Sequence, residues 1–208
     1  MSIARPQDVL LFWFGPKPYT PASVEQHSRF WFGSSSAPEL TPQADELIRQ
    51  RFDETMRAAE SGELDAWDSS PRRRLALIVL LDQFSRHFYR GAARAYARDH
   101  QALKLSVSGL LYGADAALDP LERIFFYMPL QHAESLDVQE EAVAAFRRLI
   151  EEAPAELHDT FKSALHAAIE HRDLIARFGR FPHRNAVLGR ESNSNEEAWL
   201  AHEGRRFG

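Results

Sequence analysis

The stretch PRRRLALIVLLDQFSRHFYRG, residues 71–91, decides the fold. Its centre, residues 75–81, is apolar on every side, so composition alone would also suit a buried strand. A helix is favoured because Pro71 suits the first helical turn and because the apolar pattern runs on to Phe88. Gly91 then ends the element. A helix that is apolar all round belongs at the centre of a fold, and this stretch is therefore predicted to be the central helix.

Start and stop signals on both sides of this stretch predict further helices. The clearest is Asp119-Pro120-Leu121-Glu122, which combines an N-cap, a proline at the first helical position and a glutamate at the third. Pro129 must then kink or end that helix. Other helices are expected at residues 5–14, 24–32 and 93–112, from a Thr41 N-cap to residue 61, from an Asp137 capping box to residue 150, from Pro154 to residue 178, and after a Ser194 cap. About eight helices joined by short loops predict an all-α fold, and residues 1–208 are interpreted as a single domain.

Composition excludes several classes of function. The 208 residues include no cysteine, which excludes disulfides, zinc–thiolate sites and thiol nucleophiles. The net charge of −5 disfavours nucleic-acid binding. No segment approaches the roughly 18–20 apolar residues of a membrane span, so we expect a cytoplasmic protein without a membrane partner. Because HExxH, P-loop and dinucleotide-binding motifs are absent, no metal and no cofactor are predicted.

The segment 172–190 concentrates positive charge in this acidic chain. It contains five arginines and one acidic residue, Asp173. Guanidinium groups match the geometry of carboxylate and phosphate, so the segment is a candidate anion site. A structural interpretation is equally open, in which the arginines pair with acids elsewhere and hold the last loop on the body. The candidate ligand-binding and catalytic residues here are Arg177, Arg180, His183, Arg184 and Asn185.

Two further polar clusters could carry chemistry. Asp82 and Arg86 follow the apolar stretch and share a helix face, where a simple ion pair is the alternative. Tyr127, His132 and Glu134 lie around Pro129 and could supply a general acid, a base or a proton relay. A histidine in such a place is more often structural than catalytic.

Four motifs in this chain resemble the DUF924 family, a group of largely bacterial proteins of unknown function. They are VLLFWFG at residues 9–15, LLDQFSRHFYRG at 80–91, ERIFFYMPLQHAE at 122–134 and RFGRFPHRN at 177–185. The resemblance covers nearly the whole chain and implies an all-helical fold similar to tetratricopeptide (TPR-like) arrays. It implies no reaction, substrate or cofactor. Ser85 and His87 depart from the DQFPRN pattern usual in the family, and His87 is a titratable replacement for its asparagine.

We hypothesise that the three polar segments converge on one pocket. Arg180 and Arg184 would clamp an anionic small molecule, or a peptide carrying such a group. His132 or His183 would transfer protons, oriented by Asp82 or Glu134. Three classes of function stay open: a binding module, a hydrolase or transferase acting on an anionic metabolite, and a structure without a ligand whose polar clusters are internal clamps. The sequence does not indicate an oligomeric state.

Overall fold

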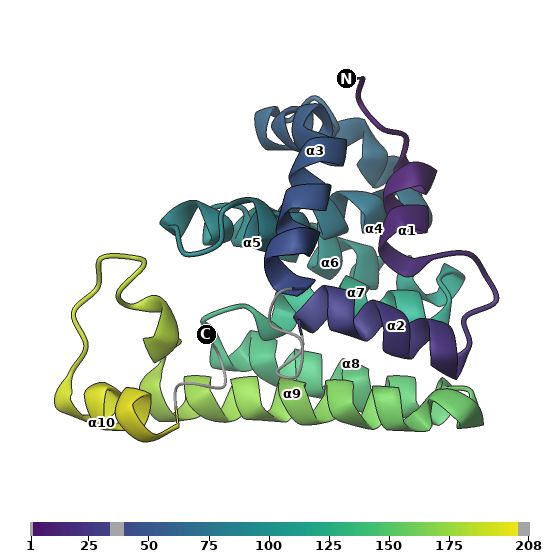
Figure 1. Cartoon of the computed structure of the whole chain (residues 1–208). Helices are drawn as coiled ribbons and strands as arrows, with labels where there is room; N and C mark the ends of the chain where they lie inside the picture. The colour runs from purple at the N-terminus through teal and green to yellow at the C-terminus, as the bar shows by residue number, and fades with distance from the viewer. Residues whose placement is uncertain (1, 34–39, 204–208) are drawn as a thin grey trace.

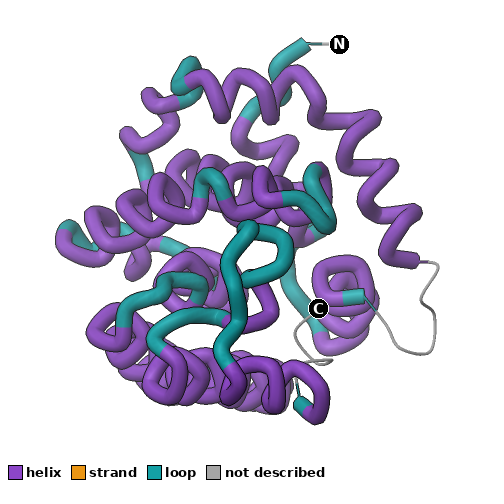
Figure 2. The backbone as a smooth tube through the Cα atoms, turned by 90° about the vertical axis from the view of Figure 1, so that its left-hand side faces the viewer, coloured by secondary structure: helices purple, strands orange, loops and turns teal. Residues whose placement is uncertain are grey.

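The structure is a computed structural model that describes residues 2–33 and 40–203. Within these ranges the backbone consists of helices and loops and contains no strand, which confirms the all-α prediction (Figures 1 and 2). The α-helices are α1 (Pro6–Phe14), α2 (Pro21–Phe32), α3 (Leu40–Ser61), α4 (Pro71–Ile78), α5 (Ser85–Phe88), α6 (Asp99–Leu111), α7 (Pro120–Gln131), α8 (Leu136–Glu152), α9 (His158–Phe178) and α10 (Ser194–His202).

Consecutive helices pack against one another in the second half of the chain. α6 packs on α7, α7 on α8, and α8 on the long α9. In Figure 1, α8 and α9 form the base of the molecule, and α1, α3 and α4 lie above them. α10 lies beside the C-terminal end of α9. A small second core joins these two helices through four buried side chains: Leu174, Ile175, Phe181 and Trp199.

The central stretch is buried as predicted, but it is not one regular helix. Residues 75–81 are at most 1% exposed and belong to the main core. After α4, residues Val79–Phe84 form a π-helical segment, η2, before α5 begins. The Ser85 hydroxyl donates to the Leu81 carbonyl oxygen at 2.7 Å, across this wider turn. Such segments are frequent at functional sites, and this one carries Asp82.

The predicted helix over residues 93–112 is interrupted. Ala93–Tyr96 forms a short 3₁₀ helix, η3, and α6 begins only at Asp99. The break places Asp99 in the first turn of α6, where a carboxylate is favoured by the helix dipole.

Other helix starts differ from the sequence prediction by a few residues. α3 begins at Leu40, so Thr41 lies inside it, and Asn193 rather than Ser194 caps α10. α8 begins before Asp137, and a 3₁₀ turn after Pro154 precedes α9. The Asp119 capping box of α7 is present as predicted. Among the described residues, no helix combines the length and apolar character that a membrane crossing needs.

Candidate functional site

Asp82 is the buried centre of the polar cluster. Its Oδ1 lies 2.8 Å from Nδ1 of His132 at the end of α7, and its Oδ2 accepts a hydrogen bond of 2.5 Å from Gln83. Arg86 contributes an ion pair, with Nη1 3.3 Å from Asp82 Oδ1. Because an ionised carboxylate only accepts hydrogen bonds, His132 must donate through Nδ1, which leaves Nε2 as the acceptor of the neutral ring.

A second carboxylate links this centre to the C-terminal segment. Asp99 accepts two hydrogen bonds from Arg86, at 2.9 and 3.0 Å. Its Oδ2 also lies 3.3 Å from Nη1 of Arg184, which is in the short 3₁₀ helix η6 (Pro182–Arg184). The same Nη1 donates to the backbone carbonyl of His132 at 3.2 Å. Negative and positive groups therefore alternate from Asp82 to Arg184.

Arg184 ends this chain of charges in an aromatic sandwich. Its guanidinium carbon lies 4.7 Å from the centre of the Tyr96 ring and 4.4 Å from that of Phe181. The side chain is 7% exposed. Its Nε is buried and has no hydrogen-bond partner among the described residues. Arg184 is thus held firmly in orientation with one donor unused.

Arg184 lines a hollow of about 460 Å³ between η3, α6 and the end of α7. We call it the Arg184 hollow. Its polar lining includes Tyr96, Asp99, His132 and Glu134. No hydrogen-bond partner of His132 Nε2 is present in the described part of the chain, and His132 also lines the hollow. The unused donor and this acceptor thus belong to side chains that line the same space.

Burial and neighbouring charges shift the pKa values in this cluster. Burial lowers the pKa of His132 to about 4, because the attraction of Asp82 only partly offsets the loss of water. Burial acts to raise the pKa of Asp82, but Arg86 and His132 outweigh it and hold that pKa well below its usual range. Burial and the nearby charge of Arg86 lower the pKa of Arg184, and Asp99 compensates only in part. The positive charge on Arg184 is therefore incompletely balanced.

Glu134 and Asn185 form a clamp next to the hollow. Glu134 pairs with Arg190 through contacts of 2.7 and 2.9 Å and accepts the Phe181 backbone N–H at 2.8 Å. Asn185 accepts a hydrogen bond of 3.0 Å from Arg190. These bonds fix the loop that presents Arg184. Glu134 lines the hollow, but both of its oxygens are occupied by Arg190.

The remaining predicted site residues lie outside the lining of the hollow. Arg180 is held by Glu196 at 2.7 and 2.8 Å, and the Tyr127 hydroxyl donates to Asp115 at 2.6 Å. Arg177 is half exposed, and its guanidinium lies 4.7 Å from the centre of the Phe178 ring. The convergence hypothesis therefore needs correction for these three residues, because each engages a group near its own element.

His183 also lies away from the hollow, between two aromatic side chains. Its ring centre is 5.4 Å from that of Phe181 and 6.4 Å from that of Trp199. Burial and the charge of Arg184 lower the pKa of His183 to about 3. His183 is thus placed in the packing between η6 and α10.

His87 belongs to a different polar group, on the side of the central segment that faces α3. Its Nδ1 lies 2.7 Å from Asp45, which also accepts two bonds from Arg90 at 2.7 and 2.8 Å. Its ring stacks on Phe30 at 6.1 Å. The family position at which this chain has histidine therefore contacts α3 and not the Arg184 hollow.

Sequence reasoning missed Asp99 and Tyr96. Both were hidden inside the helix predicted over residues 93–112, where neither stands out by periodicity. An acid at the start of a helix is a usable signal for Asp99, but the interruption that makes it a start was not predicted. No group of histidine and acidic side chains suited to hold a metal ion occurs in the described ranges.

Comparison with known proteins gives a family and one similar structure. A family model described as a bacterial protein of unknown function (DUF924) matches residues 9–204. A solved structure of a protein of unknown function from Agrobacterium tumefaciens is 33% identical, and the match covers 94% of this chain and 96% of that chain with a TM-score of 0.76. The curated proteins include no match to the chain.

Proposed function

Because the chain belongs to the DUF924 family of proteins of unknown function, we propose its function from the site itself: it binds a phosphate or carboxylate group in the Arg184 hollow. The group belongs to a small metabolite or to a peptide that carries it. Asp99, Tyr96 and Phe181 hold the guanidinium in place, and the ligand supplies the missing negative charge.

One observation carries this proposal: a buried guanidinium with a donor unused beside an open space. Asp99 is shared with Arg86, and its contact with Arg184 is longer than its two bonds to Arg86. The guanidinium therefore keeps positive charge that an anion entering the hollow can pair with. Hydrogen bonds between a guanidinium and an anion are roughly twice as strong as neutral ones.

The clamp interpretation accounts for three of the other four arginines of segment 172–190. Arg180, Arg190 and Arg172 each pair with a carboxylate at 2.9 Å or less. Arg180 and Arg190 hold α10 and the loop around η6, and Arg172 joins α9 to α8. We therefore assign anion binding to Arg184 and not to Arg180.

A second candidate function is acid–base catalysis in the same hollow. It is favoured by the pairing of His132 with Asp82, which fixes the ring and leaves Nε2 as an acceptor. A neutral His132 could take a proton from water or a hydroxyl as that oxygen attacks the bound substrate. Under this alternative, His132→Gln removes turnover of an anionic ester and leaves its binding within about threefold.

Some properties predicted from the sequence remain proposals. The sequential packing of α6, α7, α8 and α9 supports a TPR-like, helical-repeat description. A cytoplasmic location and a bacterial source remain predictions from the sequence and the family resemblance.

A thermal-shift panel tests anion binding directly. Phosphate, sugar phosphates, nucleotides and di- and tricarboxylates are compared at constant ionic strength in the parent, in Arg184→Met and in the control Arg177→Met. Methionine keeps most of the buried volume of Arg184 without its charge, and Arg177 lies in the same arginine-rich segment outside the hollow.

A ligand at about 100 times its Kd adds roughly 2.7 kcal/mol, or about 5–10 °C for a chain of this size. We expect such a shift in the parent and the control, and its loss in folded Arg184→Met. An unresponsive parent, or an equal shift in Arg184→Met, contradicts the proposal.

A further inference from the structure

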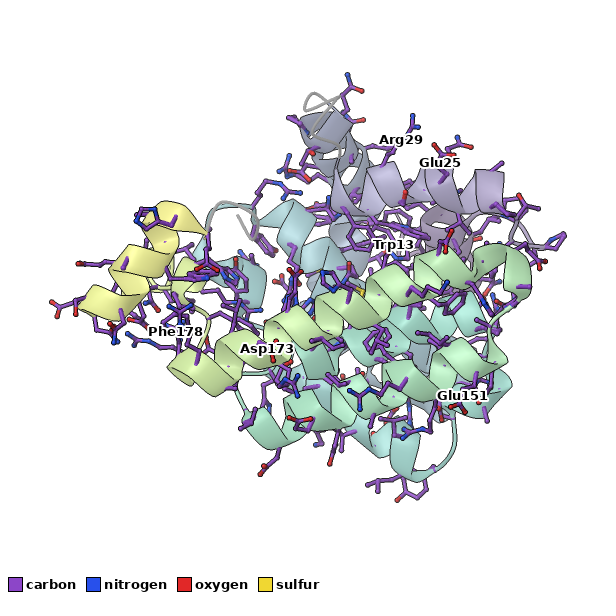
Figure 3. The ribbon with its side chains drawn as sticks, turned by 90° about the horizontal axis from the view of Figure 1, so that it is seen from below. Trp13, Glu25, Arg29, Glu151, Asp173 and Phe178 are labelled. Atoms are coloured by element: carbon purple, nitrogen blue, oxygen red, sulfur yellow. The ribbon has the colours of Figure 1, made fainter. Side chains whose placement is uncertain are left out.

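A second concave site lies on another part of the molecule, between α2 and α9. This α2–α9 groove has a volume of about 640 Å³ and shares no lining residue with the Arg184 hollow. Its walls come from α2 and the N-terminal half of α9, and its floor comes from α7 and Phe146 of α8. Figures 1 and 3 show α2 running alongside α9, with Glu25 marking α2 in Figure 3.

Aromatic rings cover much of the groove. Trp31 and Phe125 lie edge to face with ring centres 4.7 Å apart, and Phe32 lies parallel to Phe125 at 6.3 Å. Phe32 is 62% exposed, an unusual state for a phenylalanine beside a core. A volume of several hundred Å³ with an aromatic lining is typical of sites for small organic ligands.

The charged side chains that line the groove all carry the same sign. The described lining residues include three carboxylates, Glu25, Glu156 and Asp159, and no lysine, arginine or histidine. Glu25 has Arg29 at 2.7 Å, and Asp159 has Lys162 at 3.6 Å, both between well-exposed side chains where screening by water is strong. The charged side chains in the described lining are therefore all carboxylates, and they lie beside an apolar surface.

Gln131 contributes a polar side chain to the floor of the groove. It lines the groove, is 4% exposed, and its Oε1 is buried without a partner among the described residues. Leaving such an acceptor unpaired is unfavourable. The other side chains of the lining offer Oε1 no donor in this structure.

We propose that the α2–α9 groove binds an organic cation: a protonated amine on an apolar or aromatic body. The hydrocarbon part packs on the aromatic lining, in which Phe32 is the well-exposed ring, and aromatic ring faces attract cations. The ammonium N–H groups are donors only, as the rim carboxylates require. This site is independent of anion binding in the Arg184 hollow.

The test compares three eight-carbon probes that differ in charge. Octylammonium, 1-octanol and octanoate are titrated by calorimetry into the full chain at constant ionic strength. We expect saturable binding of octylammonium, with octanol about tenfold weaker and octanoate weaker still; tenfold corresponds to about 1.4 kcal/mol. Inorganic phosphate is not expected to compete.

Three variants locate the binding. Ala164→Trp fills the groove and should abolish binding, whereas His166→Trp, on the same helix outside the lining, should not. Glu156→Gln removes a lining carboxylate and should weaken octylammonium severalfold while leaving the binding of 1-octanol unchanged.

Two results overturn the proposal. Octanol or octanoate binding as tightly as octylammonium would assign the groove to an apolar partner, such as a helix of another protein. Octylammonium binding that Ala164→Trp leaves unchanged would place the cation elsewhere on the molecule.

Discussion

Neutralising Asp99 should destabilise the fold and at the same time tighten anion binding. Its carboxylate pairs with both Arg86 and Arg184. Arg86 also pairs with Asp82, whereas Asp99 is the only carboxylate paired with Arg184 among the described residues. In Asp99→Asn the shape and one acceptor oxygen remain, but the charge is lost. Two largely buried guanidinium groups then face each other with less compensation.

The size of the effect follows from burial. Removing one partner of a buried ion pair costs about 3–5 kcal/mol. The Asp99 side chain is 17% exposed, and asparagine keeps a hydrogen bond, so we expect a smaller cost, about 2–3 kcal/mol. At about 2–4 °C per kcal/mol for a chain of this length, the melting temperature should fall by about 4–12 °C.

Phosphate should restore part of this loss, because an anion in the Arg184 hollow replaces the missing charge. Melting curves of the parent, Asp99→Asn and the control Glu152→Gln are recorded in increasing phosphate, with sodium chloride holding the ionic strength. Glu152 pairs with Arg123 away from the hollow. The reasoning is refuted if phosphate raises the melting temperature of Asp99→Asn by no more than that of the parent.

Three further predictions concern the scaffold. Gly109→Ala gains about 1 kcal/mol of helix propensity, but the new Cβ would lie 2.5 Å from Phe126 Cζ and from Arg74 Nη1, so urea unfolding should show a net loss of about 1–2 kcal/mol and not a gain. His132 has a pKa lowered to about 4, so the unfolded chain takes up its proton first as pH falls; its stabilising contribution, complete above about pH 6.5, should decline toward pH 4. As the pH is lowered from 6.5 to 4, the urea midpoint should therefore fall less in His132→Gln than in the parent. Equal decreases in the two proteins would contradict a buried neutral ring. Ser85→Ala removes the hydroxyl bond to Leu81 and should cost about 1 kcal/mol in the same assay, with an unchanged midpoint as the contrary result.

The sequence predicted those parts of the fold that local chemistry determines. The capping box at Asp119 and the burial of residues 75–81 follow from side chains within one helix and are present in the structure. The π-helical segment Val79–Phe84 does not follow from periodicity, because an insertion of this kind leaves the apolar pattern readable as one helix. The break before Asp99 was hidden for the same reason.

The candidate site was only partly predictable because its contacts are distant in sequence. Asp82 and His132 are 50 residues apart, and Asp99 and Arg184 are 85 apart. Residue types indicated that Arg184 could bind an anion. They did not indicate that Arg180 would form an ion pair with Glu196. Partner choice depends on how α10 and η6 pack, which a single sequence does not express as a spacing pattern.

The Nε–Hε signal of Arg184 in a ¹H–¹⁵N spectrum tests the central claim most directly. It is assigned by its absence in Arg184→Met, and phosphate and citrate are titrated at constant ionic strength. We predict that this signal moves saturably, because the anion binds the guanidinium group that carries this N–H, while the signal of Arg180 stays in place beside Glu196. An Arg184 signal that does not move at millimolar phosphate or citrate, or shifts confined to exposed arginines, would contradict anion binding in the hollow.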